Sequence, residues 1–184
     1  NIGTSSDLGG TLNVSGIAVI STADNLDTLS LISTDADANA GPNLRLYRNS
    51  GSPADDDVIG RIDFEGRNDN SQDVIYGNIQ GEIMDASDSS EDGQMQFGVM
   101  VEGTLRNALT LDRTEVAINE DSIDSDFRVE SNGNANMLFV DGGNDKVGIG
   151  MTTALVQTLD VGGNIQVGNG RSDNAEKHAV YFGT

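Results

Sequence analysis

The sequence predicts an all-β protein made largely of short strands, and three observations support this fold class. Apolar and polar residues alternate in short, regularly spaced runs, which is the period of a β-strand. No segment of about twelve residues or more carries the apolar stripe of a helix. The chain has 23 glycines in 184 residues, well above the usual share of about 7%. We therefore expect strands separated by glycine-rich turns.

The strands are placed by the period-two runs and by the turn residues between them. The loop at 85–93 is acidic and polar, and the turns at 111–116 and 140–147 each lead into a Val-small-Ile run. The expected strands are 11–14, 17–20, 28–32, 44–47, 58–65, 74–84, 94–101, 104–111, 115–118, 127–130, 137–140, 146–149, 158–161 and 165–167.

A phrase of 17 residues occurs twice in the chain. Residues 2–18 align without gaps on residues 149–165, an offset of 149 − 2 = 147. A repeated strand unit this short cannot bury its own apolar face, so it favours an elongated, modular assembly over one closed catalytic domain. The seven identical pairs are Ile2/Ile149, Gly3/Gly150, Leu8/Leu155, Thr11/Thr158, Leu12/Leu159, Val14/Val161 and Gly16/Gly163.

The run at 74–84 has two contrasting faces. Isoleucines such as Ile79 share one face with Gly77 and Gly81, while polar residues such as Gln80 take the other. Glycines on an apolar face allow another backbone to approach closely, as near a crowded symmetry axis, or they mark β-bulges. Both interpretations stay open at this point.

Two polar tracts divide the chain into three predicted segments. The tracts at 34–43 and 120–126 are rich in Asp, Asn and Ser and carry no strand pattern. We predict an N-terminal β-repeat or shaft segment at 1–40. A central β-meander follows at 41–119, and a C-terminal β-repeat or shaft segment at 120–184.

Charge and composition exclude several classes of function. The formal net charge is −20, and no basic stripe offsets it, so nucleic-acid binding is excluded. No run approaches the roughly eighteen apolar residues of a membrane span, so no membrane insertion is expected. The chain has no Cys, hence neither a disulfide nor thiol chemistry. It starts at Asn1 and shows no signal peptide, which suggests a segment of a longer protein.

No residue pattern indicates catalysis. His178 is the only histidine and no serine lies in a nucleophile-elbow setting, so a Ser-His-Asp triad has little basis. Asp63 and Glu65 fall on one face of a strand, but thirty acidic residues make such pairs frequent by chance. The strand and turn glycines form no phosphate-binding loop. We assign no catalytic residue and no cofactor, and we expect the chain not to be an enzyme.

Calcium binding is the strongest alternative chemistry. Hard oxygen ligands gather in loops at 55–57, at Asp35 with Asp37, and at Asp141 with Asp145. Neither EF-hand spacing nor tandem nine-residue calcium repeats accompany them. We therefore favour turn formation by these aspartates and assign no metal ligand.

Several phrases resemble those of tailed-bacteriophage tail fibres and related trimeric fibre proteins. The run VGIGMTT at 147–153, followed by LDVGGNI at 159–165, is similar to their phrase VGIGTTSP…LDVxGNI. The stretches LRLYRN at 44–49, VIGRIDF at 58–64 and IMDASD at 83–88 are similar to modules of the same fibres. The chain departs from the pattern at Met151 and Ala154.

This resemblance implies an intertwined homotrimeric, β-rich shaft or distal segment of a virion fibre, located outside the cell. It implies other tail or fibre proteins and a host surface glycan or protein as partners, and it assigns no functional residue. The expected function is therefore structural and adhesive. The alternatives are a trimeric bacterial surface adhesin or extracellular filament subunit and, in another class, a glycan-degrading tailspike.

The energetics of short strands agree with a trimer. A strand such as 158–161 buries little surface alone, whereas three copies around one axis could stack Leu12 and Val14, or Leu159 and Val161, against their symmetry mates. At about 25 cal/mol per Å² of buried apolar area, each such layer adds a few kcal/mol. Three copies of charge −20 give −60 in total, so we expect salt to stabilise the assembly.

Overall fold

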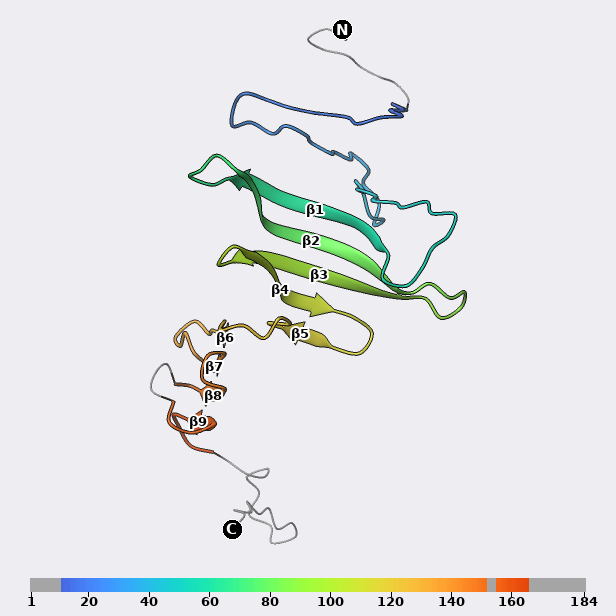
Figure 1. The fold of residues 1–184 in the computed structure, drawn as a ribbon. Helices are drawn as coiled ribbons and strands as arrows, with labels where there is room; N and C mark the ends of the chain where they lie inside the picture. The colour runs from blue at the N-terminus through green and yellow to red at the C-terminus, as the bar shows by residue number, and fades with distance from the viewer. Residues whose placement is uncertain (1–10, 152–154, 166–184) are drawn as a thin grey trace. The chain divides into compact units, whose positions relative to one another are not determined.

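The computed structural model describes residues 11–151 and 155–165 and contains only β structure within them. Nine strands form one five-stranded and one four-stranded sheet, and no described residue lies in a helix (Figure 1). The all-β prediction is confirmed for this part of the chain. With no helix there, the described residues also offer no helical segment that could cross a membrane.

The five-stranded sheet is an antiparallel meander in which each strand pairs with the next along the chain (Figure 1). Its turns follow local chemistry. Between β3 and β4, Glu102 and Gly103 both have positive φ, at 48° and 79°, as a two-residue hairpin of this twist requires. The strands are β1 Val58–Arg67, β2 Asp73–Asp85, β3 Asp92–Val101, β4 Thr104–Leu111 and β5 Val116–Ile118.

The four-stranded sheet combines two antiparallel pairs with one parallel pair. Its strands are β6 Phe127–Val129, β7 Leu138–Asp141, β8 Lys146–Ile149 and β9 Leu159–Val161, in that spatial order. A tight turn joins β7 to β8, whereas β9 returns parallel to β8. The last strand is the TLDV run of the repeated phrase, so this copy of the phrase forms a strand.

The prediction of four strands before residue 58 is wrong. The runs 11–14, 17–20, 28–32 and 44–47 form no strand. Between residues 11 and 44, no backbone–backbone hydrogen bond to another described residue is present. A strand exists only where a neighbouring segment pairs with its backbone, and period-two sequence does not supply that neighbour. The predicted strand at 165–167 falls mostly outside the described residues. Its one described residue, Ile165, lies in no strand.

The contact pattern separates two units, residues 1–45 and 46–184, and the second unit contains both sheets. The division predicted from the sequence, at 1–40, 41–119 and 120–184, stays a prediction. The five-stranded sheet spans residues 58–118 and the four-stranded sheet residues 127–161.

The described part of the chain has almost no interior. Leu155 is its only buried apolar side chain, at 8% exposure. By contrast, 28 large apolar side chains in the same part of the chain are exposed, among them Ile17 at 92%. Burial of such side chains is the main source of folding free energy, so a stable form of this chain needs a further surface to cover them.

Candidate functional site

The strand register brings apolar side chains from all five strands onto one face of the larger sheet. Directly opposed residues of neighbouring strands lie on the same face. One row across the sheet is Ile62, Ile79, Phe97, Leu109 and Ile118, and the next row is Gly60, Gly81, Met95, Leu111 and Val116. We call these ten positions the apolar face. None of them is charged.

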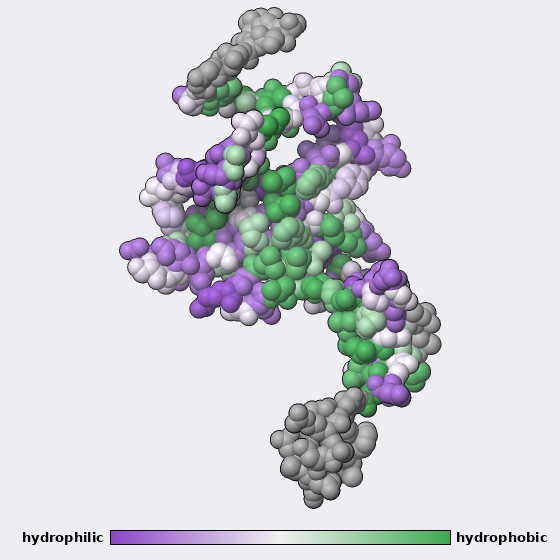
Figure 2. Space-filling model, turned by 180° about the vertical axis from the view of Figure 1, so that it is seen from behind, coloured by the Kyte–Doolittle hydropathy of each residue, from purple (hydrophilic) through white to green (hydrophobic). Residues whose placement is uncertain are grey.

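Within the described residues of the second unit, Leu46 lies against Gly60, while several other residues of the apolar face are exposed. Ile62, Met95 and Ile118 are 39%, 41% and 47% exposed, and Val116 is 67% exposed. On the side of the molecule shown in Figure 2, hydrophobic residues gather over the middle of the sheet region and hydrophilic residues lie around them. An apolar surface shared by five strands and open to water marks an interaction site in a soluble protein.

The apolar face contains a shallow hollow of about 240 Å³. Glycines at Gly60 and Gly81 form part of its lining, and Leu46, Ile79 and Met95 contribute side chains to it. A Cβ built at Gly81 would have only the Met95 Sδ within 4 Å, whereas one built at Gly60 would come within 2.9 Å of the Leu46 Cβ, so of these two glycines only Gly81 leaves its backbone open. A hollow of this shape can receive an apolar side chain or a second backbone.

The opposite face of the same sheet is polar. It carries the row Arg61, Gln80, Gln96, Thr110 and Ala117. The Gln80 amide donates to the Gln96 side chain across the strands at 3.3 Å. The two faces of the sheet therefore differ in polarity. The polar face is nevertheless buried locally, since Thr110 and Asn78 are only 3% and 8% exposed.

The smaller sheet repeats this arrangement. One of its faces carries only apolar residues, in the two rows Phe127, Val140, Val147, Leu159 and Val129, Leu138, Ile149, Val161. Leu159 is 58% exposed. The residues proposed to stack between copies, Leu159 and Val161, thus lie on an uncovered apolar face.

The other face of the smaller sheet explains the single buried leucine. Leu155 lies over Gly148, where an added Cβ would come within 2.9 Å of its Cδ2. The Lys146 ammonium donates to the Leu155 carbonyl at 2.5 Å. This local cap is formed within one chain, whereas the apolar face of the same sheet has no such cover in the described residues.

The first copy of the repeated phrase is arranged differently. Leu12 and Val14 are 65% and 52% exposed and belong to no strand. In the second copy, β9 is held by its parallel partner β8, and Val147 donates its backbone N–H to the Thr158 carbonyl at 2.8 Å. No described strand pairs with residues 11–14 of the first copy in this way.

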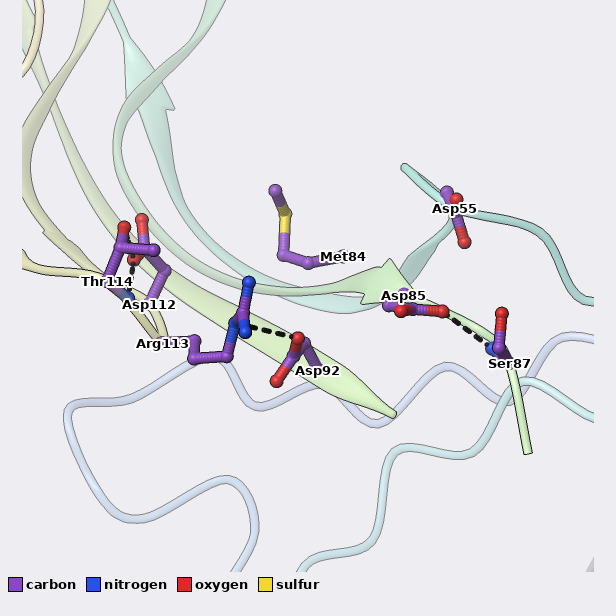
Figure 3. A pocket seen from close by; sticks show the side chains of 8 residues that line it. All are labelled: Asp55, Met84, Asp85, Ser87, Asp92, Asp112, Arg113 and Thr114. Atoms are coloured by element: carbon purple, nitrogen blue, oxygen red, sulfur yellow. Dashed lines mark hydrogen bonds and ion pairs between the residues drawn. The ribbon is translucent and has the colours of Figure 1, made fainter. Parts of the chain in front are cut away.

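A second hollow, of about 370 Å³, is lined by four aspartates and one arginine (Figure 3). Its aspartates serve the surrounding turns. Asp85 accepts the Ser87 backbone N–H at 2.8 Å, and Asp92 pairs with Arg113 at 2.9 Å. The lining residues are Asp55, Met84, Asp85, Ser87, Asp92, Asp112, Arg113 and Thr114.

Two of these aspartates have lowered pKa values for the same reason. The hydrogen bonds from the Thr114 hydroxyl and backbone N–H lower the pKa of Asp112 below its ordinary value. The Ser87 backbone N–H, first among several donors, lowers the pKa of Asp85. Donors that stabilise a carboxylate favour its ionised form, so both groups are ionised turn-formers and not proton donors at neutral pH.

The loop aspartates considered as calcium ligands are engaged in turns. Asp37 accepts the Asn39 backbone N–H at 2.8 Å, and Asp141 accepts that of Asn144 at 2.9 Å. Asp57 pairs with Arg48 at 2.9 Å. Within the ranges that the structure describes, no three acidic or histidine side chains come together in a way that could hold a metal ion.

Among the weak catalytic candidates, Asp63 and Glu65 both lie on β1. Asp63 forms an ion pair with Arg61 at 2.8 Å on the exposed sheet surface. His178 lies outside the described residues. The sequence alternation indicated which side of each strand is apolar, but the rows that cross five strands depend on register, which the sequence did not specify.

Comparison with known proteins finds no matching family model and no significantly similar curated protein.

Proposed function

We propose that this chain is a structural and adhesive segment of a homotrimeric tail fibre of a tailed bacteriophage. The observation that carries the proposal is the pair of sheets that each present an apolar face with exposed residues, such as Val116 at 67% and Leu159 at 58%. Three copies around one axis would bury these faces against each other. The resemblance of 147–153 and 159–165 to the glycine-rich phrase of phage fibres supports a fibre among the assemblies that could do so.

The distribution of charge supports copies of the same chain as partners. Each copy carries a net charge of −20, and like-charged chains repel each other at a charged contact. The rows of the apolar face contain no charged residue, so this is where identical chains can meet with the least repulsion. The acidic loops would then remain in water, where salt screens them.

A trimeric bacterial adhesin or filament subunit would use the same packing, so the biological setting needs its own test. We expect antibodies raised against this segment to label fibres on purified phage particles and to block adsorption of those particles to host cells. Labelling of bacterial surfaces in cultures free of phage, with none on virions, would contradict the fibre assignment and favour an adhesin.

A further inference from the structure

The turn between β6 and β7 has Asn132 and Gly133 at its tip, and both residues are exposed. The residues on either side close the turn. The Ser131 backbone N–H donates to the Asn134 carbonyl at 2.8 Å, and the Asn134 backbone N–H donates to the Ser131 hydroxyl at 3.1 Å. A Cβ added at Gly133 would meet nothing within 4 Å. The tip is therefore open to water while its base is fixed.

Neither the Asn132 side-chain amide nor the Gly133 backbone N–H is hydrogen-bonded within the residues that the structure describes. An amide without a partner is free to turn toward the backbone nitrogen of the next residue. Glycine offers no side chain against that approach and reaches backbone conformations that other residues rarely adopt. Since the two groups belong to neighbouring residues, their reaction is intramolecular and needs no encounter in solution.

We propose that the pair Asn132 and Gly133 is a site of spontaneous deamidation. The Gly133 nitrogen, after giving up its proton to hydroxide, attacks the Asn132 Cγ, and the new N–Cγ bond closes a succinimide ring. The bond from Cγ to the amide nitrogen breaks, and this nitrogen leaves as ammonia after taking a proton from water. A further water molecule then cleaves one of the two imide C–N bonds, which yields aspartate or isoaspartate. Reactions of this kind make asparagine a thermolabile residue.

Two other exposed asparagines show how the fold can hinder this reaction. The Asn144 side-chain amide donates to both carboxylate oxygens of Asp141, at 3.0 and 3.1 Å, so it is held away from the next residue. Asn70 is followed by Ser71, whose backbone N–H donates to the Asn68 carbonyl at 3.0 Å. In the first turn the group that would be attacked is held, and in the second turn the attacking nitrogen is held.

The turn between β7 and β8 carries the related pair Asp141 and Gly142, which is held at both residues. The Gly142 backbone N–H donates to the Asp126 carboxylate at 3.1 Å, and Asp141 accepts the Asn144 backbone N–H at 2.9 Å. A second Asn-Gly pair occurs at 168–169, outside the described residues. The dipeptide alone therefore does not single out Asn132, whereas the open tip of its turn does.

Deamidation would change the turn between β6 and β7 in two ways. Either product adds one negative charge to a chain of net charge −20. Isoaspartate also lengthens the main chain, because the backbone then runs through the former side-chain carbon. The hydrogen bond from Ser131 to Asn134 depends on the length of the chain between them. Isoaspartate should therefore break this bond and loosen β6, which lies at the edge of its sheet.

The test incubates the whole segment at mildly alkaline pH, both folded and in concentrated urea, and follows each asparagine by peptide mapping with mass spectrometry. We expect Asn132 in the folded chain to react within about threefold of its rate in urea, since an open tip gives little protection. G133A, whose added Cβ meets nothing within 4 Å, should keep the turn. It should slow the reaction at least about tenfold, because alanine lacks the conformational freedom of glycine.

D145G supplies the matched control. Asp145 has a φ of 55°, which glycine adopts readily, so this variant places an Asn-Gly pair in a turn whose side-chain amide is held. In urea, Asn144 of this variant should react as fast as Asn132. In the folded chain it should react at least about tenfold more slowly than Asn132, since its turn is protected.

Each readout concerns one turn within one chain, so the inference does not rest on the proposed function. An Asn132 that reacts more than about threefold more slowly in the folded chain than in urea would overturn it. So would a rate no faster than that of Asn144 in folded D145G, or an unchanged rate in G133A. In aged samples, the Ser131 amide of the isoaspartate fraction should exchange hydrogen at least about tenfold faster than that of the unmodified fraction. Equal exchange would overturn the loosening of β6.

Discussion

Ile79 and Phe97 lie directly opposite each other on β2 and β3, in the middle of a row of five apolar residues. Ile62 and Ile118, at the two ends of this row, are 39% and 47% exposed, while the polar face of the same sheet carries a glutamine pair. A sheet with one apolar and one polar face is half of a two-layer structure. In the proposed trimer, copies of the same chain would supply the other layer.

Leu159→Asp should weaken assembly. Leu159 is 58% exposed in the single chain, so the substitution costs little there, but in a trimer it would place three carboxylates near the axis. We expect the trimer to dissociate at lower temperature or denaturant concentration, as measured by analytical ultracentrifugation. T158D introduces the same charge at the adjacent exposed position and serves as the control. A heat-resistant trimer of L159D would count against packing through the smaller sheet.

Gly142→Ala should destabilise the turn between β7 and β8. An added Cβ at Gly142 would collide with the backbone carbonyl of Ser125, and backbone cannot move aside cheaply. We expect a loss of about 1–3 kcal/mol, seen as faster hydrogen exchange in β7 and β8. G133A is the matched control, since nothing lies within 4 Å of the added atom there. Equal exchange in the two variants would show that the turn is not packed as described.

The hairpin between β4 and β5 should lose stability in acid. Hydrogen bonds from Thr114, and then from the Glu115 backbone, lower the pKa of Asp112 in the folded chain. The stabilisation is therefore complete above the unfolded pKa of about 3.9 and is lost as the pH falls through the folded-state pKa. NMR titration of Asp112 measures this directly. In D112N the hairpin should be weaker at neutral pH and lack this pH dependence, and an Asp112 pKa at or above the unfolded value would refute the prediction.

Ionic strength should affect assembly through net charge. Three copies of −20 give −60, and the screening length shortens from about 30 Å at 0.01 M salt to about 8 Å at 0.15 M. We expect the melting temperature of the assembly to rise between about 5 mM and about 500 mM salt, because repulsion between copies is screened. A melting temperature that stays flat over this range would argue against like-charged chains in close contact.

The sequence predicted the strands of both sheets well because each has a local signal. Alternation such as Met95, Gln96 and Phe97 marks a strand with two unlike faces, and turn residues such as Gly103 mark its end. Register has no comparable local signal. Only the pairing of Ile79 with Phe97 and of Gly81 with Met95 shows that separate apolar stripes form one face.

The strands wrongly predicted before residue 58 have the right residue pattern but no described neighbouring strand. The runs TLNV at 11–14 and TLDV at 158–161 are nearly the same, yet only the second forms a strand, β9, because β8 pairs with it. Strand propensity depends on the neighbouring strand as much as on the residues themselves. The uncovered apolar face could likewise not be found from sequence, because exposure depends on what the rest of the chain leaves open.

Whether three copies assemble is decided by the mass of the purified segment in solution, measured by sedimentation or native mass spectrometry at physiological salt. A homotrimer should have three times 19.3 kDa, about 58 kDa, and its β-rich circular dichroism should be lost together with the trimer. A well-folded species of 19.3 kDa, with its β7 and β8 amides protected from exchange, would contradict it.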